Sequence, residues 1–277
     1  MESIIQVLFL TIVQMIDIVG IFIVVGFILG LLEKYSNTFL RRAYGEKGIL
    51  WTALIGTPIH EIGHLLMCLI FKHRVTKVKF FQRNDPNGVL GYVEHSYHPG
   101  SLYQRIGNFF IGIGPIFSGI GAIMLSMYLL VPNTYQAFLS YLNKEMTAGS
   151  ITKETIQTTF NACWILWNSL FSIENIQNPL FWLFLVLSIS ISSHIALSPA
   201  DIQELKNGCI AILVLLLFFN LVGTLMKIDT KGLIDVFTMY NAYWLAFSSI
   251  AIFFSCITLA ISFILYKMKS NVRRLVS

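Results

Sequence analysis

Long apolar runs, separated by short polar breaks, dominate the sequence and limit how the chain can fold. Of its 277 residues, 56% are hydrophobic and only 12% are charged, and the mean hydropathy is +0.71. Soluble domains contain about twice this share of charged residues, so the composition excludes a soluble globular protein. We therefore predict a membrane protein that crosses the bilayer several times.

Six apolar segments are long enough to cross a bilayer as helices. They lie at about 5–32, 49–71, 106–131, 179–198, 208–226 and 242–266. The polar segment 132–178 is too short for a conventional folded domain and is expected to form interfacial helices. Residues 33–48 are expected to form a connector or a short interfacial helix. The prediction is an all-α polytopic membrane protein with about six transmembrane helices, forming a single membrane-embedded domain over 1–277.

The segment between the second and third apolar runs has a different pattern. Residues 75–82 and 89–95 are rich in Val, Phe and Tyr, and the Asn-Asp-Pro-Asn-Gly sequence at 84–88 is a turn signal. We therefore predict a small membrane-associated β-hairpin over 74–98. An isolated hairpin is marginally stable in water, so it is expected to lie against the helices or to accept a strand from an extended substrate. The candidate substrate-binding residues are Val89, Leu90, Gly91 and Tyr92.

The second apolar run contains ionisable residues at a metal-binding spacing. His60 and His64 are four residues apart, and Glu61 follows His60 directly. On a helix, two such imidazoles project from one side and can bind one Zn²⁺ ion, while the carboxylate can contact a water on the metal. Ionisable groups in hydrocarbon cost about 2.5–3.5 kcal/mol each on insertion scales, so three within five residues favour a functional role. Pro58, just before the motif, predicts a kink or a break in this helix.

A catalytic zinc site usually has three protein ligands and one water, so another segment must supply the third ligand. Asp201 and His194 are the leading candidates, and Glu204 is a weaker one. Asp201 and His194 would share one helix face if the helix continued between them, although Pro199 is expected to break it. Residue chemistry favours neither of the two. Either could instead be a helix cap, a partner of a ligand or a buried polar group.

Other features of the sequence exclude some kinds of site and partner. The four cysteines show no C-x-x-C pairing, so neither a disulfide framework nor a thiolate zinc site is expected. The net charge of +5 comes from basic residues in loops beside apolar runs, where residues that determine membrane topology lie. The charge therefore does not indicate a nucleic-acid partner, and none is expected. A basic tail predicts a cytosolic C-terminus, and six spans then place the N-terminus in the cytosol too. The tail contains Lys267, Lys269, Arg273 and Arg274. The expected location is the cell membrane, with the lipid bilayer as an obligatory partner.

Four of these segments together resemble the site-2 protease group of intramembrane zinc metalloproteases. They are His60-Glu61-x-x-His64, the hairpin ending in Gly91-Tyr92-Val93-Glu94, Gly112-x-Gly114-Pro115, and Ser198-Pro199-Ala200-Asp201. They occur in the order typical of that family and cover roughly residues 50–205. The sequence departs from the family pattern in three ways. Asp201 follows Pro199 by two residues, Ile202 replaces a glycine, and the asparagine expected after Gly-Pro is not at its usual place.

The resemblance implies that His60, His64 and Asp201 bind one zinc ion and that Glu61 is the general base. It implies hydrolysis of membrane-anchored protein substrates, for regulated release or for clearance of membrane remnants. A filter for substrate length would need the 132–178 connection or an accessory membrane protein. Two other interpretations remain open at this point. One is a zinc endopeptidase of another architecture, such as a prenyl-protein-processing enzyme with Glu as third ligand, and the other is a non-proteolytic transporter or scaffold with a structural or vestigial zinc site.

Overall fold

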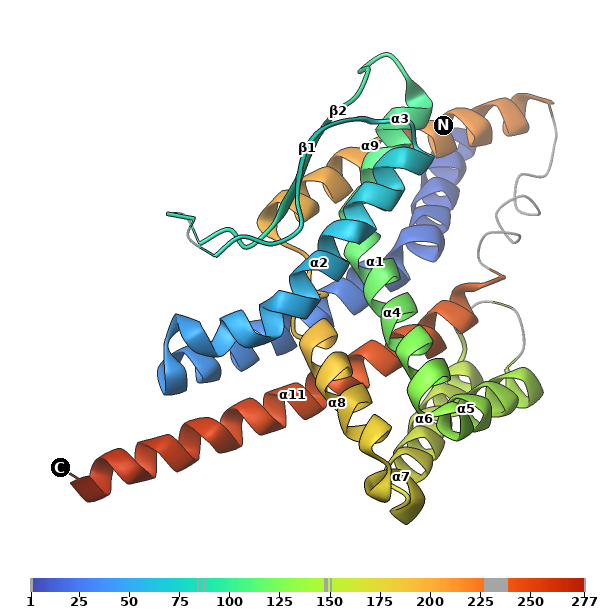
Figure 1. Cartoon of the computed structure of the whole chain (residues 1–277). Helices are drawn as coiled ribbons and strands as arrows, with labels where there is room; N and C mark the ends of the chain where they lie inside the picture. Colours follow the sequence, from blue (N-terminus) through green and yellow to red (C-terminus); the bar gives the residue numbers. More distant parts are fainter. Residues whose placement is uncertain are drawn as a thin grey trace.

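The structure is a computed structural model that describes residues 2–83, 85–86, 88–146, 149, 151–226 and 239–276. The described part is mainly helical and contains a two-stranded sheet (Figure 1). The helices are α1 (Glu2–Tyr44), α2 (Glu46–Ile70), α3 (Leu102–Gly112), α4 (Gly114–Leu130), α5 (Pro132–Glu145), α6 (Lys153–Leu170), α7 (Ile173–Gln177), α8 (Pro179–Ser192), α9 (Pro199–Met226) and α11 (Asn241–Val276). The strands are β1 (Arg74–Lys79) and β2 (Tyr92–Ser96).

Four of the described helices, α1, α2, α9 and α11, are long and apolar enough to cross a membrane. Helices α3 and α4 form a fifth apolar span if they are counted as one, although they bend by 51° at their junction. The predicted span at 179–198 is helical only over the 14 residues of α8, fewer than the roughly 20 that a straight crossing needs. The prediction of a mainly helical membrane protein is thus confirmed, whereas the count of about six spans is not.

The structure corrects the expectation about residues 33–48 and excludes a break, though not a kink, at Pro58. Residues 33–44 continue α1 without a break, so 33–48 is not a separate connector or short helix. The chain turns at Gly45, which has φ of 67°, a backbone conformation that glycine adopts readily because it has no Cβ. Pro58 does not break α2, which is helical from Glu46 to Ile70.

The helices predicted between 132 and 178 are α5, α6 and α7.

The predicted β-hairpin is present. Strands β1 and β2 are antiparallel, with Lys79 opposite Tyr92, and they contact α2. Beyond the strands, the backbone N–H of Gln82 donates to the Leu90 carbonyl at 2.7 Å. The predicted turn at 84–88 includes Asn84 and Asn87, which lie outside the described residues.

Helix α2, which carries the His-Glu-x-x-His motif, contacts α1, α3, α4 and α8 (Figure 1). It lies close to α4 at Gly63 and Gly114, where a Cβ on Gly114 would be only 2.7 Å from the Gly63 carbonyl oxygen. Pro115 follows in the first turn of α4, where a missing N–H leaves no helical hydrogen bond unmade. The Gly-Pro segment therefore contributes a helix start and a close helix contact.

We expect Gly63→Ala to lower the free energy of unfolding of the detergent-solubilised protein by about 1–3 kcal/mol. The added methyl group would meet the backbone of Gly114, which cannot move aside as a flexible side chain can. Gly121→Ala on α4 is the matched control, because a Cβ there has no neighbour within 4 Å. Denaturant unfolding of both variants measures the difference, and equal midpoints would contradict a tight α2–α4 contact.

Candidate metal centre

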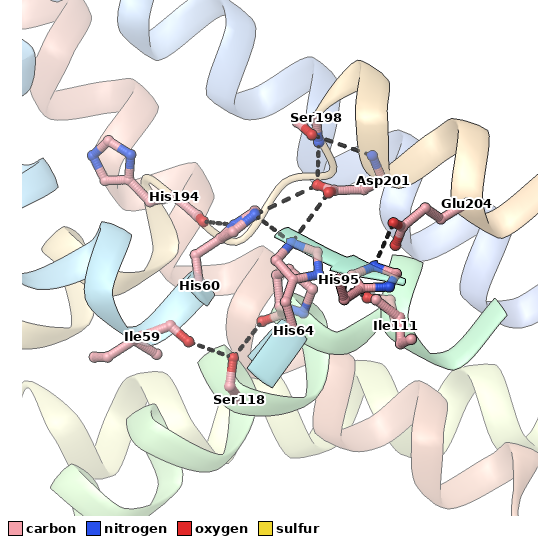
Figure 2. Close-up of polar contacts among 11 residues, drawn as sticks. Ile59, His60, His64, His95, Ile111, Ser118, His194, Ser198, Asp201 and Glu204 are labelled. Carbon is pink, nitrogen blue, oxygen red and sulfur yellow. Dashed lines mark hydrogen bonds and ion pairs between the residues drawn. The ribbon is translucent and has the colours of Figure 1, made fainter. Parts of the chain in front are cut away.

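The His-Glu-x-x-His motif on α2 meets the first turn of α9. His60, His64 and Asp201 each offer one ligand atom, and these atoms lie within 4.8 Å of one another. His64 Nε2 is 3.1 Å from His60 Nε2 and 3.1 Å from Asp201 Oδ1 (Figure 2). His60 Nε2 is 3.4 Å from Asp201 Oδ2. No other cluster of His, Cys, Asp and Glu in the described part of the chain has this spacing, so this His-His-Asp group is the candidate metal centre.

Two backbone carbonyls orient the imidazole rings. His60 Nδ1 donates to the His194 carbonyl at 2.7 Å, and His64 Nδ1 donates to the Ile111 carbonyl at 2.9 Å (Figure 2). A carbonyl only accepts hydrogen bonds, so each Nδ1 carries the hydrogen and each neutral ring keeps a lone pair on Nε2. Two lone pairs and a carboxylate therefore face one another. A cation among them would offset their repulsion, so the donor set fits a metal ion.

The start of α9 positions the Asp201 carboxylate. The Ser198 backbone N–H donates to Asp201 Oδ2 at 2.6 Å, and the Asp201 N–H donates to Ser198 Oγ at 3.3 Å. This reciprocal pair is a capping box, and Pro199 occupies the first helical position, where proline is favoured. The same carboxylate therefore caps the helix and belongs to the metal group, so these two roles of Asp201 are compatible.

The other two candidate third ligands have different partners. His194 Nε2 is 3.0 Å from Thr52 Oγ1, and its ring points away from the metal group in Figure 2. Only its backbone carbonyl reaches the site, through His60. Glu204 Oε1 is 2.7 Å from His95 Nε2. Asp201 is therefore the residue that completes the group with the two motif histidines.

Glu61 and the metal group line one cavity of about 770 Å³. Its walls come from α1, α2, the hairpin and the segment between His194 and Glu204. Glu61 is only 5% exposed, and Gly91 lies against it, because a Cβ on Gly91 would be 2.9 Å from Glu61 Oε1. All four candidate substrate-binding residues line this cavity. They are Val89, Leu90, Gly91 and Tyr92.

No family model matches the chain. Neither a curated protein nor a solved structure matches it at a significant level. Inferences about function therefore depend on the residues and their geometry.

Glu33 on α1 is a further residue of the site that belongs to none of the sequence motifs. Its Oε2 accepts the backbone N–H of Ala196 at 3.2 Å, and the residue lines the cavity. Ala196 belongs to the loop that carries the His194 carbonyl and leads to Asp201. Glu33 thus links α1 to the loop that orients His60. Glu33 directly follows the apolar run at 5–32 and precedes Lys34, so no sequence pattern distinguishes it from an ordinary polar residue at the end of a span.

Proposed function

We propose that the chain is a zinc-dependent intramembrane endopeptidase of the site-2 protease type, which hydrolyses membrane-anchored protein substrates. The observation that carries this proposal is the convergence of His60, His64 and Asp201 in the cavity that Glu61 also lines. Three nitrogen or oxygen ligands with one open position are the donor set of catalytic zinc. Tetrahedral zinc with bonds of about 2.0–2.1 Å has ligand atoms about 3.3 Å apart. The two histidine Nε2 atoms are 3.1 Å apart. Asp201 approaches each of them with a different oxygen, Oδ1 at 3.1 Å from His64 and Oδ2 at 3.4 Å from His60, and one ligand atom from each residue lies within 4.8 Å of the other two.

Peptide hydrolysis would need a Lewis acid, a general base and groups that orient the metal ligands, and the protein offers a residue for each protein-based role. Zinc, when bound, acts as a Lewis acid that lowers the pKa of water and polarises the scissile carbonyl. Glu61 accepts a proton from the attacking water and passes it to the leaving amine. The His194 and Ile111 carbonyls hold His60 and His64 in the tautomer that directs Nε2 at the metal. Asp201 contributes the negative charge of the ligand set.

The hairpin would hold the substrate beside Glu61. A transmembrane helix has its peptide bonds hydrogen-bonded within the helix, so a substrate must unwind locally before water can attack. Residues 88–93 line the cavity, and an extended peptide could add to this segment by main-chain hydrogen bonds. Gly91 has no side chain to separate the hairpin backbone from Glu61, so such a peptide would lie close to the proposed base.

The finer topology is also part of the proposal. The chain would form one membrane-embedded domain of the cell membrane, with α8 as a short sixth span and both termini in the cytosol. The basic residues near the C-terminus support this orientation. An accessory membrane protein could select substrates. Labelling of single cysteines, introduced near each terminus, from one side of sealed vesicles tests the orientation.

Reconstituted protein with a panel of single-span reporter proteins tests the proposed activity. We expect cleavage within or at the edge of the membrane segment, loss of cleavage after chelation, and recovery on addition of Zn²⁺. Chelation should act at the group of His60, His64 and Asp201, because no other described group of three residues has metal-binding spacing. Zinc-loaded protein that cleaves no reporter, with a cellular phenotype unchanged in Glu61→Gln, would favour the transporter or scaffold interpretation.

A further inference from the structure

Three side-chain contacts connect the hairpin to α3 and α9 beside the metal group. His73, just before β1, has its Nε2 2.9 Å from the Gln104 carbonyl of α3. Its Nδ1 lies 3.1 Å from His95 Nδ1 of β2. His95 Nε2 in turn lies 2.7 Å from Glu204 Oε1 of α9 (Figure 2). Glu204 follows Asp201 by three residues, so this chain of contacts ends one helical turn from the metal group.

These three contacts need three hydrogens. The Gln104 carbonyl only accepts, so His73 must donate to it from Nε2. The contact between His73 and His95 needs a second hydrogen, and the contact between His95 and Glu204 needs a third. Two neutral imidazoles supply two hydrogens, and a carboxylate supplies none. One extra proton is therefore required before all three hydrogen bonds can form together.

The surroundings place this extra proton on the His95–Glu204 pair. His73 is 5% exposed, and burial lowers its pKa, which favours the neutral imidazole there. The His95 side chain is also largely buried, at 7% exposure, but it lies directly against a carboxylate, which stabilises an imidazolium. Two other titratable side chains lie beside these residues. Tyr97 stacks on His73, and Cys68 of α2 lies near Glu204.

We propose that His95 and Glu204 are positioning residues that hold the hairpin against α9 only while they share this extra proton. After the proton is lost, neutral His95 has one N–H and must give up either His73 or Glu204. The attachment is therefore complete while the extra proton is present and weakens when a rise in pH removes it. His95, Glu204 and residues 88–93 line the cavity. Release of the hairpin would affect a substrate only if the proposed function is right, because that function assigns residues 88–93 to substrate binding. The attachment itself does not depend on the proposed function.

Hydrogen exchange of the β1 and β2 amides in the full chain tests this attachment. A hairpin released from α9 is marginally stable in water. Relative to intrinsic exchange rates, wild-type exchange should therefore rise about tenfold between about pH 6 and about pH 9. Glu204→Gln is the decisive variant, because its amide N–H supplies the third hydrogen without an extra proton. We expect slow exchange at both pH values in Glu204→Gln and fast exchange at both in Glu204→Ala.

Glu94→Gln, next to His95 on β2, is the matched control. The Glu94 carboxylate forms an exposed ion pair with Lys77 at 3.3 Å, so this variant should keep the wild-type pH dependence. Wild-type exchange that does not change with pH, or Glu204→Gln exchange that changes as much as wild type, would overturn the proposal. The measurement needs neither metal nor substrate. A failed cleavage assay would therefore not contradict the proposed hairpin attachment. A failed exchange test would likewise not contradict the proposed protease function.

Discussion

Glu61→Gln is expected to reduce reporter cleavage by about 10²–10⁴-fold, the usual contribution of a general base, while zinc remains bound. Glutamine keeps the shape of the side chain beside Gly91 and the metal group, but it cannot accept a proton from water. The two histidines and Asp201 are unchanged, so the metal site is retained. Single-turnover cleavage and metal content, measured on the same preparation, check both parts of this expectation.

Glu145→Gln serves as the control for this experiment. Glu145 is at the end of α5, where its carboxylate pairs with the neighbouring Lys144, and it does not line the cavity. Its substitution should leave cleavage unchanged. Cleavage by Glu61→Gln at the wild-type rate, with zinc fully bound, would show that the proposed mechanism is wrong.

Asp201→Ala is expected to weaken zinc binding by more than about 100-fold, beyond the usual effect of losing a group that only supports a ligand. This variant removes one of three donors and leaves the Nε2 atoms of His60 and His64 without the facing carboxylate. It also removes the cap on Ser198. Asp201→Asn separates the two effects, because an amide oxygen still accepts the Ser198 N–H but lacks the carboxylate charge. Metal titration and thermal unfolding of both variants measure ligation and helix capping separately.

His194→Ala is the matched comparison for the third ligand. This change removes the ring that contacts Thr52 but keeps the backbone carbonyl that accepts from His60 Nδ1. We therefore expect near wild-type zinc occupancy. Full occupancy in Asp201→Ala together with loss in His194→Ala would reverse the assignment of the third ligand.

Features that depend on local sequence could be predicted well. The apolar runs predicted α1, α2, α9 and α11, because about 20 consecutive apolar residues suffice for a membrane-crossing helix. Runs rich in Val, Phe and Tyr, together with a turn signal, predicted the hairpin between α2 and α3. Helix lengths were harder to predict. Hydropathy ends the first span near residue 32, but α1 continues to Tyr44, since polar residues such as Glu33 and Asn37 are compatible with a helix and contact each other along it.

The contacts around the site could not be predicted from residue spacing. Glu33 is 163 residues before its partner Ala196, and Glu204 is 109 residues after His95. Neither pair belongs to a motif with a fixed interval. Such contacts depend on how α1, the hairpin and α9 pack together, which hydrophobic periodicity does not specify.

The sequence by itself determined the membrane-protein class and the metal-binding face of α2, because both depend on neighbouring residues and on helix periodicity. Only the tertiary structure decided which distant side chain joins His60 and His64. Asp201 and His194 were equal candidates by chemistry. The turn between α8 and α9 directs the His194 ring to Thr52, while the cap at Ser198 holds the Asp201 carboxylate toward the histidines. Close packing of α9 on α3, where a Cβ at Gly112 would lie 2.6 Å from the Asp201 carbonyl oxygen, sets that carboxylate within reach of the metal group.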